Sequence, residues 1–208
     1  MPPFLWNGPD DAPVTLVLAH GAGAPMDSPF LEKFARGLAE SGIRVARFEF
    51  PYMHARREGG RGGAPDRTPV ALDAWRAAYA LVQAGAAGRV AIGGKSFGGR
   101  MASLIADEVE AAGLVCLGYP FHPPGRPEKP RTAHLEALRT PTLIVQGTRD
   151  PFGTPDDIGG YVLSPAIRIK WLESGEHSWK PLARSGRTEA LNMEQGIEAT
   201  AGFLAALP

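Results

Sequence analysis

The sequence lacks several features that would tie it to particular cellular settings. It has one cysteine, Cys116, so it cannot form a disulfide within the chain, which fits a reducing compartment. It has no apolar run of membrane-spanning length, and no basic segment followed by an apolar stretch at its start. It also has no excess charge, because 22 basic residues balance 22 acidic ones. We therefore expect a soluble cytoplasmic protein whose partners are neither nucleic acid nor membrane.

The length and the turn-forming residues indicate one globular unit. A chain of 208 residues can bury a sizeable core, because proteins of this size bury roughly 70% of the surface that they expose when unfolded. The 26 glycines and 20 prolines fall mainly between apolar runs and show no fixed period, which argues against repeats. We expect a single domain over residues 1–208 that binds a small molecule; the composition leaves the oligomeric state open.

Short apolar runs alternate with segments of helical spacing. The apolar runs lack strict alternation with polar residues, which is typical of strands buried on both faces of a parallel sheet. They cover residues 14–19, 43–48, 89–93, 114–118, 142–146 and 167–172, and the helical segments cover 29–41, 69–84, 97–109, 132–138, 156–163 and 187–206. This order predicts an α/β fold with a mainly parallel sheet, whose reactive groups gather at the carboxyl ends of the strands.

The stretch GGKSFGG at residues 93–99 is compatible with two kinds of loop. A phosphate-binding loop needs a glycine, four further residues and then Gly-Lys-Ser, but the glycine position holds Arg89. A nucleophile elbow needs small residues two before and two after its serine, and Gly94 and Gly98 occupy those positions around Ser96. The spacing favours Ser96 as a nucleophile at a helix N-terminus, where negative charge is stabilised; a glycine-rich turn without chemistry is the alternative.

A serine nucleophile requires a base and a group that orients the base. Asp150 follows the strand predicted at 142–146, and His177 follows the strand predicted at 167–172, so both lie at carboxyl ends of strands. The alternatives are Asp156, Asp157 and Glu176 for the acid and His54, His122 and His134 for the base. Asp156 and Asp157 fit the start of a helix better, where aspartate caps free amides, and His134 fits a surface position.

A glycine-rich turn after the first predicted strand supplies candidate oxyanion donors. It reads HGAGA from His20, and its exposed amides would act together with the Phe97 amide. Ala22 is the first choice for the second donor and Gly23 the next, while His20 is expected to brace the loop.

These segments together resemble the α/β-hydrolase superfamily over nearly the whole chain. The segments LVLAHGAGAPMDSPFLEKFARGLAESGIRVARFEFPYM, GGKSFGGRMAS, GTRDPFG and SGEHSW look more narrowly like small bacterial hydrolase-like proteins related to two animal families, testis-expressed protein thirty and nonspecific-lethal-complex subunit three. Dienelactone hydrolases look like more distant relatives, although their nucleophile is a cysteine. The resemblance implies a serine hydrolase in which Ser96, Asp150 and His177 act in that chain order.

The predicted activity is therefore hydrolysis of small esters or related acyl compounds, without metal or organic cofactor. A non-catalytic scaffold or ligand-binding protein on the same fold is the alternative. Prolines dominate residues 119–140, which leaves too little chain for a lid domain. The residues expected to contact substrate around an open cleft are His20, Met26, His54, Arg56, Arg57, Phe121, His122 and Trp179. The loop 55–67 carries four arginines that either bind an anionic substrate or are simply solvated, and the role of Lys95 is left open.

Overall fold

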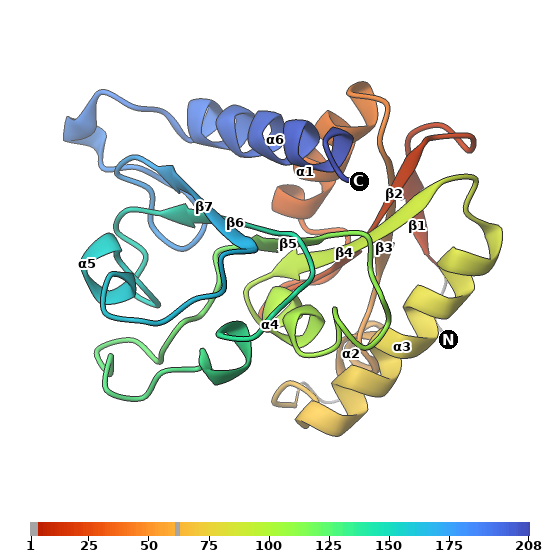
Figure 1. Ribbon diagram of the computed structural model, residues 1–208, viewed down its shortest axis with the longest axis horizontal. Helices are drawn as coiled ribbons and strands as arrows, with labels where there is room; N and C mark the ends of the chain where they lie inside the picture. Colours follow the sequence, from red (N-terminus) through yellow and green to blue (C-terminus); the bar gives the residue numbers. More distant parts are fainter. Residues whose placement is uncertain (1–3, 61–62) are drawn as a thin grey trace.

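A seven-stranded sheet forms the centre of the computed structural model, which describes residues 4–60 and 63–208 (Figure 1). The strands are β1 (Leu5–Asn7), β2 (Val14–Ala19), β3 (Arg44–Phe48), β4 (Arg89–Lys95), β5 (Leu114–Leu117), β6 (Thr142–Gly147) and β7 (Ile167–Leu172). Their order across the sheet is β1-β3-β2-β4-β5-β6-β7, with β1 antiparallel to β3 and every other pair parallel. The predicted mainly parallel sheet is confirmed.

Helices cover both faces of this sheet. They are α1 (Pro29–Glu40), α2 (Pro51–Arg57), α3 (Thr68–Gly85), α4 (Phe97–Ser103), α5 (Pro155–Ile158) and α6 (Glu189–Ala205), with short 3-10 turns at Ala133–Leu135 and Ala183–Ser185. Figure 1 shows α1 and α6 on one face and α2, α3 and α4 on the other. The three-layer arrangement places the carboxyl ends of β2, β4, β6 and β7 along one edge of the molecule, where the predicted site residues follow them.

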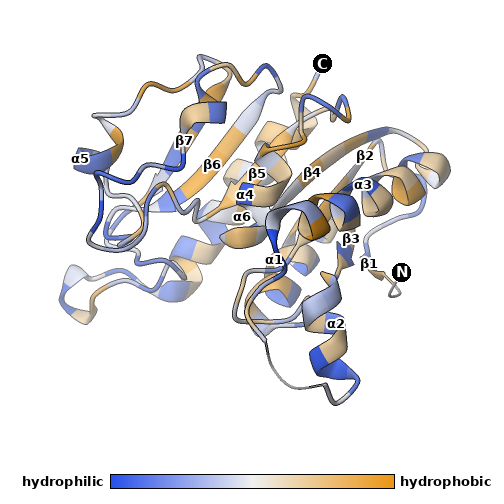
Figure 2. Ribbon diagram, turned by 90° about the horizontal axis from the view of Figure 1, so that it is seen from below, coloured by the Kyte–Doolittle hydropathy of each residue, from blue (hydrophilic) through white to orange (hydrophobic). Residues whose placement is uncertain are grey.

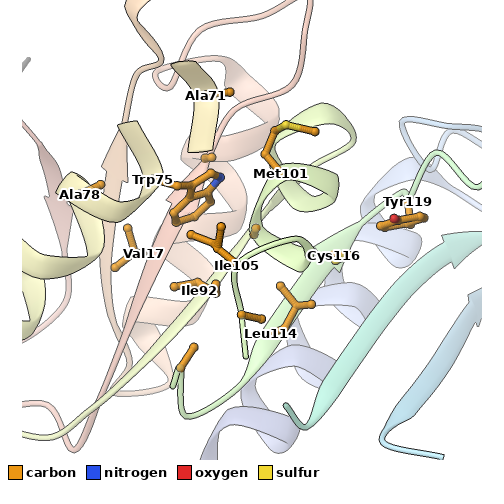
Figure 3. Packing of buried hydrophobic residues seen from close by; sticks show 14 of the residues in the cluster. Val17, Ala71, Trp75, Ala78, Ile92, Met101, Ile105, Leu114, Cys116 and Tyr119 are labelled. Carbon is orange, nitrogen blue, oxygen red and sulfur yellow. The ribbon is translucent and has the colours of Figure 1, made fainter. Parts of the chain in front are cut away.

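The core lies on both faces of the strands, as their unbroken apolar runs predict. On β2, Leu16 and Leu18 pack toward α1 and α6, while Val17 and Ala19 join the cluster under α3 and α4. Figure 2 shows the hydrophobic residues concentrated along the central strands, and Figure 3 shows Trp75 of α3 packed over this second cluster. Burial on both faces removes the polar alternation that a half-exposed strand would show.

Five elements differ from the sequence-based expectation, one of which is the helical segment predicted over 132–138, which is only a 3-10 turn at Ala133–Leu135. Strand β1 and helix α2 were not predicted; α2 begins at Pro51, whose fixed φ suits a first helical turn, and it buries Tyr52 and Met53. Helix α4 ends at Ser103 rather than near residue 109, because the next amides bond three residues back instead of four. Helix α5 ends at Ile158, where two glycines follow.

The segment between β5 and β6 contains no inserted lid domain. Residues 119–140 hold a single 3-10 turn and pack Tyr119, Phe121 and Leu135 into the core. The absence of a lid is thus confirmed, because the prolines leave only short irregular backbone. Within residues 4–60 and 63–208, no helix has the length and apolar character needed to cross a membrane.

Cys116 lies in the middle of β5, directly behind α4. Its side chain is 1% exposed, and its Sγ is 3.6 Å from the carbonyl oxygen of Gly99. Burial raises the pKa of the thiol well above its ordinary value, because the thiolate would lose its hydration. The cysteine is therefore a packed core residue, as predicted.

Candidate active site

Ser96 occupies a sharp turn between β4 and α4. Its backbone has φ 49° and ψ −111°, a conformation that a non-glycine residue adopts at a cost of about 1–3 kcal/mol. Two backbone bonds hold it there: the Ser96 amide donates to Leu117 O at 3.0 Å, and the Arg100 amide donates to Ser96 O at 2.9 Å. The turn has the strand-turn-helix context that the elbow interpretation requires.

The glycines around Ser96 are required by close backbone contacts. A Cβ placed on Gly94 would lie 2.6 Å from the carbonyl carbon of Gly98, and one on Gly98 would lie 2.5 Å from His20 O. No real Cβ tolerates such distances, so any larger residue would push the turn away from β2. The predicted need for small residues on both sides of the serine is met by this packing.

The loops that carry Asp150 and His177 are joined to each other by backbone contacts. After β6, the amides of Thr148 and Arg149 donate to Leu172 O at 3.0 Å and Gly175 O at 2.8 Å. A Cβ on Gly147 would lie 2.3 Å from Gly175 O, so glycine is needed for this approach. These bonds bring residues 27 positions apart in sequence into one site.

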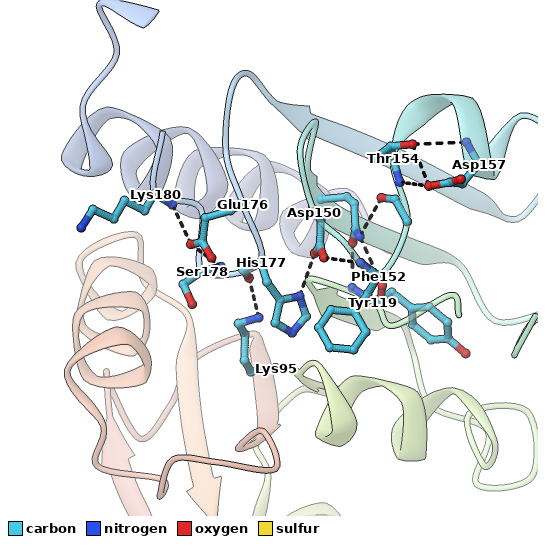
Figure 4. A network of polar contacts seen from close by, with 12 residues as sticks. Lys95, Tyr119, Asp150, Phe152, Thr154, Asp157, Glu176, His177, Ser178 and Lys180 are labelled. Carbon is cyan, nitrogen blue, oxygen red and sulfur yellow. Dashed lines mark hydrogen bonds and ion pairs between the residues drawn. The ribbon is translucent and has the colours of Figure 1, made fainter. Parts of the chain in front are cut away.

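Asp150 holds His177 in a defined orientation (Figure 4). Asp150 is fully buried, and its Oδ2 accepts a bond from His177 Nδ1 at 2.7 Å, while its Oδ1 accepts from the Phe152 amide at 2.9 Å. Since an ionised carboxylate can only accept, Nδ1 carries the proton and Nε2 keeps a free lone pair. The Phe152 ring packs on the imidazole with centroids 4.4 Å apart, which restricts the ring further.

His20 and Tyr52 brace the glycine-rich loop after β2. His20 Nε2 accepts from the Phe50 amide at 3.1 Å, so its Nδ1 donates to Gly21 O at 2.7 Å. The Tyr52 hydroxyl lies 3.1 Å from the carbonyl oxygens of both Gly21 and Ala22. Burial lowers the pKa of His20, which favours the neutral tautomer that these bonds require. The brace predicted for His20 is present, and Tyr52 adds a support that the sequence did not indicate.

A cleft of about 520 Å³ joins these groups. It is lined by Gly21, Ala22, Gly23, Ala24, Ser28, Pro29, Phe30, Leu31, Lys95, Ser96, Phe152, His177 and Ser178. In the described part of the chain, the amides of Ala22, Gly23 and Phe97 donate to no protein acceptor. The predicted nucleophile, base and oxyanion loop therefore share one cavity with free donors.

None of the eight residues expected to contact substrate, His20 included, lines this cleft. Met26, Phe121 and Trp179 are 4%, 0% and 0% exposed, because large apolar side chains at strand ends gain more by packing under the loops than by facing water. Trp179 packs edge-on against Phe30 at 4.8 Å between centroids and so supports a residue that does line the cleft. The prediction that these three edge the site is wrong.

The other histidines are also placed away from the cleft. His122 is buried, with Nδ1 2.9 Å from Pro123 O and Nε2 3.4 Å from Asp157 Oδ2, and His54 is half-buried on α2. His134 is half-buried rather than on the surface, with Nε2 2.8 Å from Ser103 Oγ. Burial and the Arg100 charge lower the pKa of His134 to about 4, so it is neutral at pH 7. None of these three histidines lines the cleft that contains Ser96.

The two candidate anion-binding arginines are engaged within the protein. Arg57 forms ion pairs with Glu49 at 2.6 Å and Asp27 at 2.9 Å, and Arg56 donates to Gly63 O and lies over the Tyr52 ring. Both belong to helix α2 rather than to an open loop, which corrects their assignment as substrate contacts. Arg61, also part of that prediction, lies outside the described residues.

The alternative carboxylates have roles of their own. Asp157 accepts bonds from the amide and hydroxyl of Thr154 at 2.9 and 2.7 Å, which forms the N-terminal cap of α5. The prediction that these aspartates begin a helix is confirmed. Glu176 accepts from the amides of Ser178 and Lys180 at 2.8 and 3.2 Å, so it closes the turn next to His177.

Phe30, Phe152 and Lys95 line the cleft but were not predicted to do so from the sequence. Phe30 comes from the first turn of α1, and its place depends on how that helix packs against β3 and α6. For Lys95, one signal in the sequence could have indicated a place in the cleft: it directly precedes Ser96. Among residues 4–60 and 63–208, no group of three histidine, cysteine, aspartate or glutamate side chains is arranged to hold a metal ion.

Comparison with known proteins identifies the family of the chain and structures of similar fold. The family described as alpha/beta hydrolase domain matches residues 12–205. A serine hydrolase without a lid from Xanthomonas campestris is 22% identical, with 98% of this chain and 89% of that chain covered and a TM-score of 0.72. Dienelactone hydrolase from Anabaena variabilis is 16% identical, with 97% of this chain and 90% of that chain covered and a TM-score of 0.73. An esterase domain from Rhodothermus marinus is 14% identical, with 96% of this chain and 90% of that chain covered and a TM-score of 0.69.

Proposed function

This chain belongs to the alpha/beta hydrolase domain family, and on that premise we propose that it cleaves small, soluble esters through Ser96, His177 and Asp150. Membership makes the chain a hydrolase; the ester bond and the roles of the three residues are the proposed part. We further propose that it acts in the cytoplasm, and that its nearer kin are small bacterial proteins related to the testis-expressed protein thirty and nonspecific-lethal-complex subunit three families.

One observation carries the proposal: a serine on a strained elbow shares a cleft with a histidine whose other ring nitrogen is bonded to a buried carboxylate. A glycine-rich turn without chemistry has no need of a serine at φ 49°, where glycine would be less strained. The free amides on the same cleft supply what a developing oxyanion requires. A scaffold protein would gain nothing from retaining these features together.

The proposed reaction proceeds through an acyl-enzyme. His177 Nε2 takes the Ser96 Oγ proton as Oγ attacks the ester carbonyl carbon, and the amides of Phe97 and Ala22 donate to the oxyanion. His177 then gives that proton to the leaving alkoxide, so the alcohol departs. Water attacks the acyl group with the same histidine as base, which releases the acid and restores Ser96. Throughout, Asp150 fixes the imidazole tautomer and stabilises its charged form.

Labelling with a fluorophosphonate tests the nucleophile directly. We expect the wild-type protein to gain one phosphonyl group at Ser96, identified by peptide mass spectrometry, because only a serine activated by a base reacts at a useful rate. The Ser96→Ala and His177→Ala variants serve as controls and should stay unlabelled. If the folded wild-type protein resisted labelling, the non-catalytic scaffold would become the better interpretation.

The small, lidless cleft predicts a preference for short acyl groups. Esters of roughly two to six acyl carbons should give the highest kcat/KM, because Phe30, Leu31 and Phe152 offer an apolar wall of limited extent. A series of 4-nitrophenyl esters measured below and above micelle formation checks this. Faster turnover of long chains, with a jump in rate at the interface, would contradict the small-esterase proposal.

A further inference from the structure

Lys95 lines the cleft immediately before Ser96 in sequence, and its ammonium lies 5.7 Å from the ring centre of Phe30, another lining residue. Within residues 4–60 and 63–208, it is the one lysine or arginine that lines the cavity, and no aspartate or glutamate of this part of the chain lines it. The remaining wall consists of backbone, serine hydroxyls, apolar side chains and His177. The cleft therefore presents a formal positive charge without an acidic counterpart on its surface.

The ammonium of Lys95 is held in place but not neutralised. Its Nζ donates to the carbonyl oxygen of His177 at 2.7 Å and lies 5.7 Å from the centre of the Phe30 ring (Figure 4). Gly118 backs it so closely that a Cβ there would lie 2.8 Å from Nζ. An ammonium has three donors, and this is the single hydrogen bond of Nζ within residues 4–60 and 63–208. Two donors are thus left for a ligand.

The nearest carboxylates are committed elsewhere. Asp150 accepts from His177 and from the Phe152 amide, and Glu176 accepts from two amides of its own turn. Neither forms an ion pair with Lys95 among the described residues. A half-buried cation without an ionic partner is costly, and an apolar residue such as methionine would fill the same space without that cost. This cost indicates that the positive charge is retained for a ligand in the cleft and not for the stability of the fold.

From this arrangement we infer that Lys95 is a specificity-determining residue: its ammonium binds a carboxylate on the substrate, so that the preferred substrates are esters carrying a carboxylate a few bonds from the scissile carbonyl. The inference rests on the proposed hydrolase function, and it names the substrate class. Fixing Nζ against His177 O pre-organises the receptor, because the flexible lysine chain has already lost its freedom before the ligand arrives.

The titration of Lys95 predicts that the preference for anionic substrates depends on pH. Burial lowers the pKa of the Lys95 ammonium to about 8, while the charges of Asp150 and Glu176 act in the opposite direction. Lys95 is therefore charged below about pH 8 and loses its charge as the pH rises through that value. The advantage of an anionic substrate over a neutral one should decline in the same range.

The test compares matched esters in the wild type and the Lys95→Met variant. The acyl-side pair is mono-4-nitrophenyl glutarate and 4-nitrophenyl pentanoate, corrected for spontaneous hydrolysis; the alcohol-side pair is 4-acetoxybenzoate and 4-methylphenyl acetate. Loss of the bond to His177 O lowers the rates for both members of a pair. We expect an additional loss of about 10- to 100-fold in kcat/KM for the anionic member of one pair, the size of a charge-assisted bond. The pair that shows it tells which side of the ester carries the carboxylate.

Lys180→Met is the control, because Lys180 is exposed on the same loop as His177 and does not line the cleft. It should leave the anionic-to-neutral ratio unchanged. In the wild type this ratio should fall above about pH 8, and in Lys95→Met it should be flat. Equal losses for both members of each pair would overturn the inference and leave Lys95 as a positioning residue for His177.

A binding measurement separates the inference from the proposed function. Monomethyl glutarate is titrated calorimetrically into Ser96→Ala and into Ser96→Ala/Lys95→Met, with circular dichroism to verify that both are folded. Binding weakened about 10-fold or more by the second substitution supports the carboxylate receptor even if no ester is hydrolysed. Equal affinity, or no binding to either protein, overturns it, while failure of the wild type to turn over any ester counts against the proposed function alone.

Discussion

Replacing Ser96 with alanine is expected to lower kcat for ester hydrolysis by about six orders of magnitude, the loss that accompanies removal of the nucleophile from a Ser-His-Asp set. The fold should persist, because Ser96 is half-buried at the cleft and its hydroxyl fills no core space. Turnover of a short 4-nitrophenyl ester, together with thermal unfolding, gives both values. Substantial hydrolysis by a folded Ser96→Ala protein would exclude this nucleophile.

Ser96→Gly provides the matched control for the strained backbone. Alanine keeps the φ of 49° that serine has, whereas glycine adopts it without a steric penalty. Both variants should be inactive, but Ser96→Gly should be more stable than Ser96→Ala by about 1 kcal/mol. Equal stabilities would mean that the surrounding bonds relax the turn once the hydroxyl is gone.

Replacing Asp150 with asparagine is expected to reduce kcat by about 10⁴-fold, the effect known for the corresponding change in a Ser-His-Asp set. The asparagine amide can donate to Nδ1, which would move the histidine proton to Nε2 and remove the lone pair that takes the Ser96 proton in the proposed reaction. KM should change far less than kcat, because Asp150 is fully buried and does not line the cleft. Steady-state kinetics on a neutral ester measures both constants.

Asp156→Asn is the control for this prediction. Asp156 is exposed in the first turn of α5, and its conversion removes a charge close in sequence without touching the histidine. Its kcat should stay near the wild-type value. A large loss in Asp156→Asn with a small loss in Asp150→Asn would show that the wrong acid has been assigned.

The positions of the three proposed catalytic residues were predictable because each depends on local constraints. An elbow needs glycine at Gly94 and Gly98 for steric reasons, and these show in the sequence. Asp150 and His177 directly follow apolar strands, so the topology of a parallel sheet brings them to one edge. The sequence thus predicted six of the seven strands and the edge of the sheet at which these three residues lie.

The aromatic and basic residues that line the cleft were not predictable in this way. Whether Trp179 or Phe30 faces the cleft depends on how a loop packs against α1, and both are aromatic residues near a reactive segment. Arg57 looked free because its partner Glu49 is a buried acid at the end of the neighbouring strand β3. Such choices are made by long-range packing, which periodicity and turn signals do not encode.

The single thiol of Cys116 can report on local opening of the fold without an added probe. A thiol reagent reaches Sγ only when the packing between α4 and β5 or the sheet itself opens, since the closed state leaves the side chain 1% exposed and protonated. The ratio of the labelling rate to that of the unfolded chain therefore yields the free energy of opening at the wall behind the elbow. No engineered cysteine is needed. A variant that loosens the elbow without unfolding the sheet would be detected by a higher rate of modification at Cys116 Sγ.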